Sequence, residues 1–420
     1  MHVELLTIGD ELCRGEIVNT NGAWMAAKLW DMQISVDHIV TCGDLEPEMT
    51  AALRNAAKRS DLVLVCGGLG PTVDDLTVDV VSKVAGLRAV EHKPSAKRMK
   101  VRFTELGIPL IGDVMRQVRH PEGSTVYENP VGAAPSFEIC LDNAVVICLP
   151  GPPREMKSIF TTHLEARIAQ LRAASGQEVE CVAKKIFRVF GKGESVIAAA
   201  MEGLQLGQGA SLHYQVVFPE VLVKVVVRDK DEYLARDQLD RVSKDVRIRL
   251  DGAIYGEDDT SMAQAVGDLL RQRGETIATA ESCTGGMIGG KLTDAPGSSE
   301  YYLGGAVTYS NAEKTRQCGV EELVLETHGA VSQEVVIAMA EGIRERVGSS
   351  WAVSVSGIAG PGGGSDDRPV GTVWVAVAGP DGKTTSKKYS WPGDRDRVRL
   401  LACNWALNAV RRRIIEEETI

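Results

Sequence analysis

The sequence predicts an α/β protein built from three domains. A single domain typically takes about 150 residues, so 420 residues point to more than one. Near both ends of the chain, short apolar runs alternate with amphipathic segments of helical length, as in parallel βα units. The region between them is richer in β-branched residues. We therefore expect an α/β domain at residues 1–173, a small α+β domain at residues 174–256 and a second α/β domain at residues 257–420.

The composition is that of a globular protein and disfavours a nucleic-acid-binding surface. Hydrophobic residues make up 44% and charged residues 25% of the chain. The net charge of −10, from 47 basic and 57 acidic residues, has the wrong sign for gripping a phosphate backbone. The nine cysteines are scattered through the chain and have no metal-binding spacing, as in proteins of a reducing compartment. The sequence shows no apolar run or leader that could enter a membrane. We therefore expect a cytoplasmic protein.

In the first domain, strands and helices are expected to alternate. Apolar runs of strand character occupy residues 2–9, 35–43, 61–68 and 143–153, and the last of these ends in a proline-rich turn. Helical periodicity marks residues 21–31, 49–58 and 154–173.

Two turns of this domain suggest a ligand site. A glycine-rich turn follows the strand at residues 61–68, and an acidic turn ends the first strand, so in a parallel sheet both lie at the edge where ligands bind. Glycine amides near a helix start suit a phosphate, and carboxylates suit a divalent cation. The candidates for ligand binding are Gly67, Gly68, Gly70, Thr72 and Asn21, and those for the metal are Asp10, Glu11, Asp74 and Asp75. The alternative is a pair of structural turns with Asp75 as a helix cap.

The middle domain and the last domain also show their elements in the pattern. In the middle domain we expect strands at residues 184–191 and 220–229 and helices at residues 194–203 and 231–250. In the last domain we expect helices at residues 262–273 and 394–418 and strands at residues 275–280, 302–310, 351–357 and 371–379.

The last domain contains a candidate nucleophile. The run ETIATA delivers Ser282 to a tight turn that opens a helix, where the backbone amides of Cys283, Thr284 and Gly285 could hold an oxyanion. Gly286, the next residue of the turn, is a further candidate for substrate binding. The only histidine of this domain, His328, has no obvious place beside the serine. A lysine with a pKa lowered by burial can replace it, directly or through a tyrosine hydroxyl. Tyr309 lies at the end of the next expected strand, and Lys314 lies at the start of the helix that follows it. The alternatives are a solvated Lys314 and Cys283 as the nucleophile.

A second glycine-rich segment could contact the substrate of this domain. Gly357, Gly360 and Gly362 follow the strand at residues 351–357 and could wrap a phosphate or ribose; a flexible loop is the alternative. Arg395 lies near the start of the last helix, and its guanidinium could bind phosphate oxygens in a bidentate manner.

These motifs occur in an order that resembles the bacterial CinA family over nearly the whole chain. GDELCRGEIVNTN, GGLGPTVDDLT, NPVGAAPSF and LPGPPREM resemble its N-terminal block, which is related to molybdopterin-binding domains. AESCTGG, GGAVTYSNAEK, HGAVS, GIAGPGGG, PVGTVWVA and GDRDRVR resemble its C-terminal amidase block. The resemblance implies a three-layer N-terminal domain, a KH-like middle domain and a C-terminal α/β amidase domain.

The resemblance also implies two hydrolytic activities. The C-terminal domain is similar to nicotinamide mononucleotide amidases, which need no cofactor; Ser282 would be the nucleophile, with Tyr309 and Lys314 as proton-transfer partners. The N-terminal domain is similar to metal-dependent ADP-ribose pyrophosphatases, with Asp10, Glu11 and Asp75 near the metal and the GGLGPT loop on phosphate. A homodimer is also implied. Two other functions stay open: a pterin- or nucleotide-binding regulator without turnover, and an accessory protein of competence or DNA repair, which the acidic charge disfavours.

Overall fold

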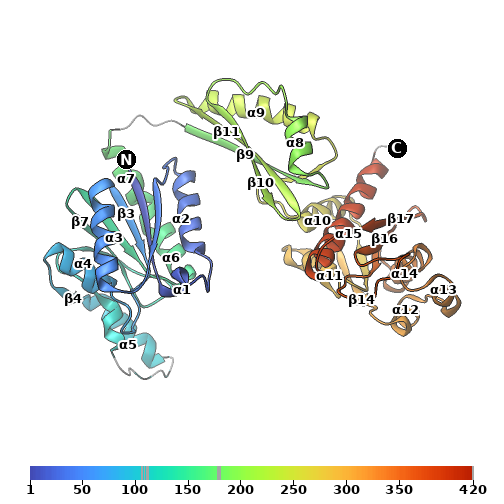
Figure 1. The fold of residues 1–420 in the computed structure, drawn as a ribbon, viewed down its shortest axis with the longest axis horizontal. Coiled ribbons are helices and arrows are strands. Elements are labelled where there is room, and N and C mark those ends of the chain that lie inside the picture. The colour runs from blue at the N-terminus through green and yellow to red at the C-terminus, as the bar shows by residue number, and fades with distance from the viewer. Residues whose placement is uncertain (106, 108, 110–112, 177–180, 419–420) are drawn as a thin grey trace. The chain divides into compact units, whose positions relative to one another are not determined.

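A computed structural model describes residues 1–105, 107, 109, 113–176 and 181–418 (Figure 1). The chain divides into two compact units, one formed mainly by residues 1–182 and the other mainly by residues 183–420. The second unit contains two separate sheets, one in the middle region and one in the C-terminal region.

The N-terminal unit is organised around a six-stranded sheet with the order β2-β1-β3-β8-β7-β6. The first four strands are parallel, and β7 and β6 are antiparallel to their neighbours. The strands are β1 (Val3–Ile8), β2 (His38–Cys42), β3 (Leu62–Cys66), β6 (Thr125–Tyr127), β7 (Ser136–Leu141) and β8 (Ala144–Leu149). The expected parallel βα pattern is therefore confirmed, and the sequence pattern missed the antiparallel extension through β7 and β6.

Helices cover both faces of this sheet, which gives the expected three layers (Figure 1). Successive strand residues point to opposite faces: Leu5 and Leu64 pack under α2, α6 and α7, and Leu6 and Val65 pack under α3 and α4. The helices are α1 (Asp10–Cys13), α2 (Thr20–Asp31), α3 (Glu46–Arg59), α4 (Thr77–Ala85), α5 (Lys93–Glu105), α6 (Pro153–Ile159) and α7 (Glu165–Ala174), with a π turn (Phe160–Leu164) between the last two and a 3-10 turn (Val114–Val118) after α5. A two-stranded sheet pairs β4 (Ala89–Glu91) with β5 (Arg119–Pro121).

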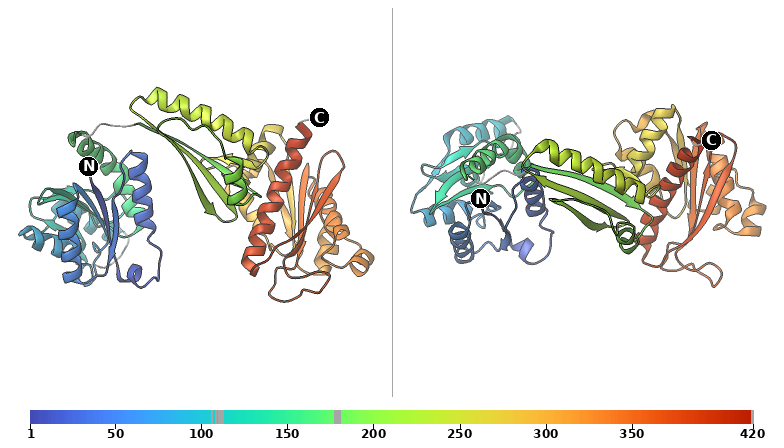
Figure 2. Two further views of the ribbon diagram at one scale, coloured as in Figure 1. Left: turned by 45° about the horizontal axis from the view of Figure 1, so that its top comes forward. Right: turned by 90° about the horizontal axis from the view of Figure 1, so that it is seen from above.

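The middle region forms a small α+β domain, as expected. Its sheet has the order β10-β11-β9-β12, and two helices pack on it through a core that includes Phe187, Val225, Leu239 and Val246. Figure 2 shows the longer helix, α9, lying along the strands. The elements are β9 (Cys181–Phe190), α8 (Glu194–Ala200), β10 (Ala210–Val217), β11 (Glu220–Asp229), α9 (Glu232–Arg249) and β12 (Ile254–Glu257).

The C-terminal region forms an α/β domain around a five-stranded sheet with the order β14-β13-β15-β16-β17. The first three strands are parallel, and β16 and β17 are antiparallel, so the sheet is mixed. The strands are β13 (Ile277–Glu281), β14 (Tyr302–Val307), β15 (Trp351–Gly357), β16 (Thr372–Ala378) and β17 (Thr384–Ser390). β14 ends before Thr308, so Tyr309 lies beyond the strand in which the pattern placed it.

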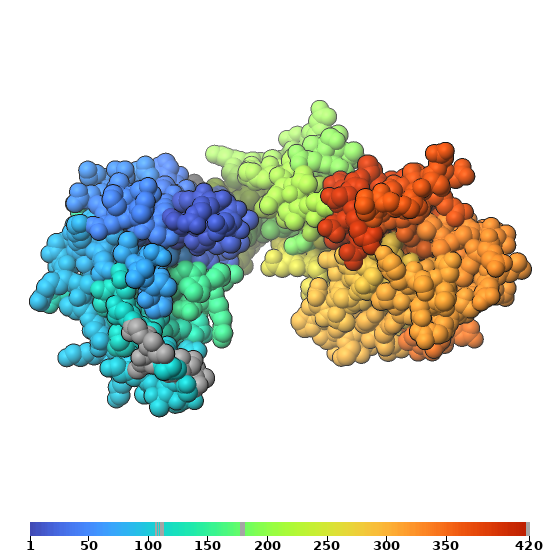
Figure 3. Space-filling view, turned by 60° about the horizontal axis from the view of Figure 1, so that its bottom comes forward, coloured from blue at the N-terminus to red at the C-terminus, as the bar shows by residue number. Residues whose placement is uncertain are grey.

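Helices also cover both faces of the C-terminal sheet. One core lies under α10, α11 and α15, and smaller cores lie under α12, α13 and α14. Figure 2 shows α15 lying along the sheet, and in the space-filling view the segments coloured from yellow to red pack into one body (Figure 3). The helices are α10 (Met262–Arg273), α11 (Met287–Asp294), α12 (Asn311–Cys318), α13 (Glu322–His328), α14 (Gln333–Val347) and α15 (Arg395–Glu418), with a 3-10 turn (Ser298–Glu300) before β14.

Candidate active site

Ser282 lies in a tight turn at the carboxyl end of β13, an inner strand of the C-terminal sheet. Its amide continues the parallel ladder by donating to the carbonyl of Val355 at 2.9 Å. The amide of Gly285 then donates back to the carbonyl of Ser282 at 3.1 Å, which closes a β-turn. Gly285 and Gly286 have φ values of +61° and +95°, a region that favours glycine, before α11 begins at Met287. The Ser282 side chain is thus fixed at the sheet edge, with 8% of the residue exposed.

Lys314 is the group that meets the Ser282 hydroxyl. It lies on the first turn of α12, is 1% exposed, and places Nζ 3.2 Å from Ser282 Oγ and 2.8 Å from the carbonyl oxygen of Thr308. No carboxylate among the described residues forms an ion pair with it. Burial disfavours the charged ammonium and lowers the pKa of Lys314 below its ordinary value of 10.5. A larger fraction of neutral amine is therefore available to accept a proton from Ser282.

Tyr309 is placed differently from the predicted relay. The residue is 60% exposed, and its hydroxyl accepts a hydrogen bond from Nη2 of Arg395 at 2.9 Å. In the described part of the chain, no hydrogen bond links this hydroxyl to Ser282 or to Lys314. The structure thus brings Ser282 and Lys314 into direct contact and groups Tyr309 with Arg395.

The backbone amides near Ser282 have different partners. The amide of Gly285 is used inside the turn, and the Glu281 carboxylate accepts the amides of Gly286, Ile288 and Gly289 at 2.9, 3.1 and 2.8 Å. The buried Glu281 side chain therefore occupies the start of α11. Among the described hydrogen bonds, the amides of Cys283 and Thr284 have no acceptor in another residue, and the Cys283 amide contacts only its own thiol. The expected oxyanion site is therefore narrowed to these two amides.

Cys283 points into the protein instead of toward a substrate. Its side chain belongs to the hydrophobic core beneath α11 and α15, and the residue is 5% exposed. Burial raises the pKa of the Cys283 thiol to about 12, so the reactive thiolate is disfavoured at neutral pH. The geometry favours Ser282 over Cys283 as the nucleophile.

The second glycine-rich segment is tied to the same site through Arg395. Nη1 of Arg395 donates to the carbonyl of Gly360 at 2.8 Å, while Nη2 reaches Tyr309. A side chain at Gly357 would come within 2.9 Å of the Thr372 carbonyl oxygen, whereas Gly362 faces open space. Arg395 is exposed and keeps further N–H donors for an anion.

Three contributors to this site were missed in the sequence: Glu281, Thr308 and Arg399. Arg399 lies one helical turn after Arg395 and donates to the carbonyls of Cys283 and Thr284 at 3.1 and 3.0 Å. For Glu281 the signal was an acidic residue directly before Ser282. For Arg399 the signal was its spacing of four residues from Arg395, which places both on one side of α15.

In the N-terminal domain, the two predicted turns line one cavity of about 570 Å³. It lies at the carboxyl ends of β1, β3 and β8 and contains most of the predicted ligand residues. The lining residues are Ile8, Gly9, Glu11, Asp44, Gly67, Gly68, Leu69, Gly70, Pro71, Thr72, Asp74, Asp75, Gln117, Ala134, Pro150, Gly151, Pro152 and Glu155. A side chain at Gly67 would come within 2.3 Å of the Ile8 carbonyl oxygen, which explains why glycine stands where the two turns meet.

Two predicted residues, Asn21 and Asp10, are not among those lining the cavity. The side-chain amide of Asn21 donates to the carbonyl of Gly151 at 2.7 Å and supports the cavity wall from behind. The Asp10 carboxylate pairs with Arg14 at 2.5 Å and accepts the amide of Asp44 at 3.2 Å. These bonds lower the pKa of Asp10 and fasten two loops together.

The acidic side chains of the two turns do not meet in one metal-binding cluster among the described residues. The Asp75 carboxylate accepts the amide and the hydroxyl of Thr72 at 2.8 and 2.6 Å. Burial, together with the charges of Asp10, Glu11 and Asp74, raises the pKa of Asp44. Among the described residues, no three His, Cys, Asp or Glu side chains are close enough to hold a metal ion. The side chains as placed do not form a metal site by themselves.

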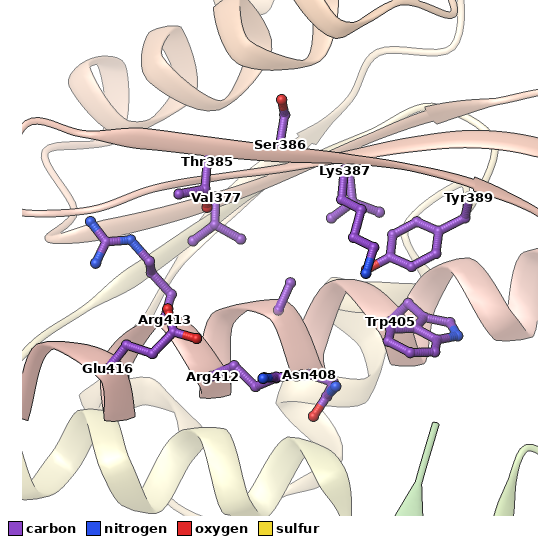
Figure 4. Close-up of a pocket in the computed structure, with 12 residues that line it drawn as sticks. Val377, Thr385, Ser386, Lys387, Tyr389, Trp405, Asn408, Arg412, Arg413 and Glu416 are labelled. Carbon is purple, nitrogen blue, oxygen red and sulfur yellow. The ribbon is translucent and has the colours of Figure 1, made fainter. Parts of the chain in front are cut away.

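A further cavity of about 310 Å³ lies between β17 and α15 (Figure 4). Tyr389 and Trp405 line one end, and Lys387, Arg412 and Glu416 are among its charged residues. None of the residues predicted for catalysis lines it.

No helix in the described part of the chain is long and apolar enough to cross a membrane. Three family profiles match in succession: "Probable molybdopterin binding domain" at residues 4–170, "Damage-inducible protein CinA KH domain" at residues 184–256 and "CinA C-terminal domain" at residues 259–414.

Relatives match this chain over nearly its whole length. A "CinA-like protein" of Geotalea uraniireducens is 38% identical over 417 residues, which cover 99% of this chain and 98% of that protein. A "CinA-like protein" of Geobacter sulfurreducens is 39% identical over 416 residues, covering 99% of this chain and 100% of that protein. Among solved structures, the competence damage-inducible protein A from Klebsiella pneumoniae is 36% identical, with a TM-score of 0.36, and covers 37% of this chain and 95% of that one.

Proposed function

This chain belongs to the CinA family, and on that premise we propose that its C-terminal domain is a serine amidase that converts nicotinamide mononucleotide and water to nicotinate mononucleotide and ammonia. The observation that carries the proposal is the buried Lys314 Nζ at 3.2 Å from Ser282 Oγ. A nucleophilic hydroxyl beside an amine of lowered pKa is the arrangement that serine–lysine acyl transfer requires.

The proposed reaction has two steps. Neutral Lys314 takes the proton of Ser282 as Oγ attacks the carboxamide carbon, and the developing oxyanion accepts from the amides of Cys283 and Thr284. Lys314 returns the proton to the leaving nitrogen, and ammonia departs. Water then gives a proton to Lys314 and attacks the acyl carbon. As the bond from that carbon to Ser282 Oγ breaks, Lys314 returns the proton to Oγ, which releases nicotinate mononucleotide and restores both residues. The direct contact removes the need for Tyr309 in the proton path.

Arg395 and Tyr309 are proposed to bind the substrate. Nicotinamide mononucleotide carries one phosphate and one aromatic pyridinium ring. Guanidinium groups bind phosphate oxygens, and the exposed ring of Tyr309 can stack on the pyridinium. Tyr309→Phe should therefore lower kcat less than about tenfold, whereas removal of a required general acid or base typically lowers it by about 100-fold or more.

The proposal is tested by ammonia release from nicotinamide mononucleotide. Ser282→Ala should lower kcat by at least about 1,000-fold, because the nucleophile is removed. Ser299→Ala, an exposed serine of the same domain, is the matched control and should leave kcat unchanged. Equal turnover of Ser282→Ala and the wild type would refute the assignment.

For the N-terminal domain, we propose a second, metal-dependent activity in which water cleaves the pyrophosphate of ADP-ribose to AMP and ribose 5-phosphate. The support is the cavity of about 570 Å³ beside the GGLGPT turn. Among the described residues that line it, five carry carboxylates and none is Lys or Arg, so an anionic ligand needs a cation to neutralise this charge. A divalent ion, which prefers oxygen ligands, fits that need.

Product formation separates this activity from simple binding. ADP-ribose should be cleaved with Mg²⁺ and not with excess EDTA, and Asp74→Asn should reduce the rate, whereas the exposed Glu105→Gln should not. Thermal stabilisation by ADP-ribose without product would instead support a nucleotide-binding regulator.

A further inference from the structure

We propose that Arg399 is a positioning residue of the amidase site, which orients and polarises the two backbone amides that receive the oxyanion. This inference rests on the proposed function, because it assigns a role within acyl transfer at Ser282. Arg399 lies on α15, far from Ser282 in the sequence. Its Nε donates to the carbonyl of Cys283 at 3.1 Å and its Nη2 to the carbonyl of Thr284 at 3.0 Å.

The contact of Arg399 Nε with the carbonyl of Cys283 acts on the amide of Thr284 through a single peptide group. The carbonyl of Cys283 and the amide of Thr284 belong to the same peptide unit. A hydrogen bond from a guanidinium to that carbonyl withdraws electron density and makes the Thr284 N–H a stronger donor. The contact also fixes the plane of the peptide, and so the direction in which this N–H points.

The second contact reaches the other free amide through a chain of two peptide groups. Nη2 of Arg399 polarises the peptide that joins Thr284 to Gly285, and the amide of Gly285 donates to the carbonyl of Ser282 at 3.1 Å. The Ser282 carbonyl shares a peptide with the amide of Cys283. Both amides without an acceptor thus end hydrogen-bonded chains that begin at Arg399, and such chains strengthen cooperatively.

The positive charge of Arg399 is available for this role. The side chain is 28% exposed, and the acid that pairs with it, Asp396, lies 3.9 Å from Nη1 and is 93% exposed, so solvent screens that pair. Nε and Nη2 are both directed to the turn. On the far side of the turn, the buried Glu281 carboxylate holds the next three available amides, so the turn is fixed from both ends.

The test uses two variants of Arg399 and one control in the full-length protein. Arg399→Met keeps the length of the side chain without the donors, and Arg399→Lys keeps the charge with a single donor group. Arg412→Met, an exposed arginine on the same helix, is the control. Thermal melting of each variant verifies folding.

Two readouts report on the oxyanion site. The first readout is ammonia release. Loss of a whole oxyanion donor typically lowers kcat by about 100- to 1,000-fold, whereas Arg399→Met only weakens two such donors. This variant should therefore lower kcat by about 10- to 100-fold and keep KM within about threefold. The second is the rate at which a fluorophosphonate labels Ser282, since the phosphonyl oxygen occupies the same site. In Arg399→Met this labelling rate should fall in parallel with kcat, and in Arg399→Lys it should lie between the rates of Arg399→Met and the wild type. Guanidinium ion at millimolar concentration should partly restore the labelling rate of Arg399→Met and should not change that of Arg412→Met.

The outcomes distinguish this inference from the proposed function. Wild-type labelling and kcat in a folded Arg399→Met variant would overturn the role of Arg399, as would a loss that guanidinium and Arg399→Lys both fail to restore. If the wild type labels at Ser282 but releases no ammonia, the substrate proposal fails, and the labelling rates still test Arg399. If Ser282 of the wild type does not react with the probe, the inference falls with its premise.

Discussion

Lys314 is the residue whose removal tests the proposed chemistry most severely. We consider Lys314→Met, which keeps the length and burial of the side chain and removes the amine. The variant loses the contact of 3.2 Å to Ser282 Oγ and the hydrogen bond of 2.8 Å to the Thr308 carbonyl. A positioned general base typically contributes about 100- to 10,000-fold, so kcat should fall by about 1,000-fold.

The effect on stability should be small by comparison. The Thr308 carbonyl loses its Lys314 donor, which costs about 1–3 kcal/mol. The buried site disfavours the charged ammonium of Lys314, as its lowered pKa shows, so replacing this side chain with Met also removes an unfavourable burial cost. That gain offsets part of the loss. Because its pKa is lowered on folding, Lys314 binds fewer protons in the folded chain than in the unfolded chain. Its contribution to the free energy of unfolding is therefore most favourable above the unfolded pKa of 10.5. That contribution is lost as the pH falls through the lowered pKa of the folded chain. Urea unfolding at neutral pH should therefore show a change of less than about 2 kcal/mol.

The pH profile gives the sharpest readout. Because neutral Lys314 is the active form, kcat/KM should rise with pH through the pKa of Lys314, which lies below 10.5, and should be lost as pH falls. Lys388→Met, an exposed lysine of the same domain, is the control and should keep both rate and profile. A Lys314→Met variant that retains a tenth of the wild-type kcat would refute the role of Lys314 as general base. So would a variant whose kcat/KM falls at low pH in the same way as that of the wild type.

Three further predictions concern neighbouring groups. Glu281→Gln should destabilise the protein by about 1–3 kcal/mol in urea unfolding, because a carboxylate that accepts three amides becomes a neutral amide; unchanged unfolding would contradict the role of Glu281 at the start of α11. Cys283→Ala should keep kcat within about tenfold, since the buried thiol with a pKa of about 12 is not the nucleophile; a loss as large as that of Ser282→Ala would show otherwise. Asp75→Asn should weaken the turn in which the Asp75 carboxylate accepts the amide and hydroxyl of Thr72. The variant should cleave ADP-ribose more slowly and release ammonia at the wild-type rate. A parallel loss of both activities would count against separate sites.

The sequence predicted the parts of the fold that repeat a simple pattern. Continuous apolar runs identified the parallel strands, and glycine after β3 identified the turn in the N-terminal cavity. β17 escaped notice because its residues Thr384–Ser390 alternate between half-buried and exposed and carry little apolar character. The pairing of Lys314 with Ser282 was predictable because each residue closely follows one of two neighbouring parallel strands.

What the sequence could not provide were side-chain directions beyond the strand ends. Tyr309 follows β14 by two residues, and the contact with Arg395, which is remote in the chain, decides where its hydroxyl lies. The pairing of Asp10 with Arg14 was visible as an i, i+4 spacing, but the exchange of amide hydrogen bonds between Asp10 and Asp44 depends on how β1 and β2 meet. Contacts between distant segments require the folded backbone.

The most direct test of the central claim is mass spectrometry of the Ser282 peptide after acid quenching of the protein during turnover of nicotinamide mononucleotide. Nucleophilic attack by Ser282 predicts a peptide heavier by one nicotinate mononucleotide acyl group, present in the wild type and absent in Ser282→Ala. An adduct on Cys283, or undiminished turnover by Ser282→Ala, would contradict the account.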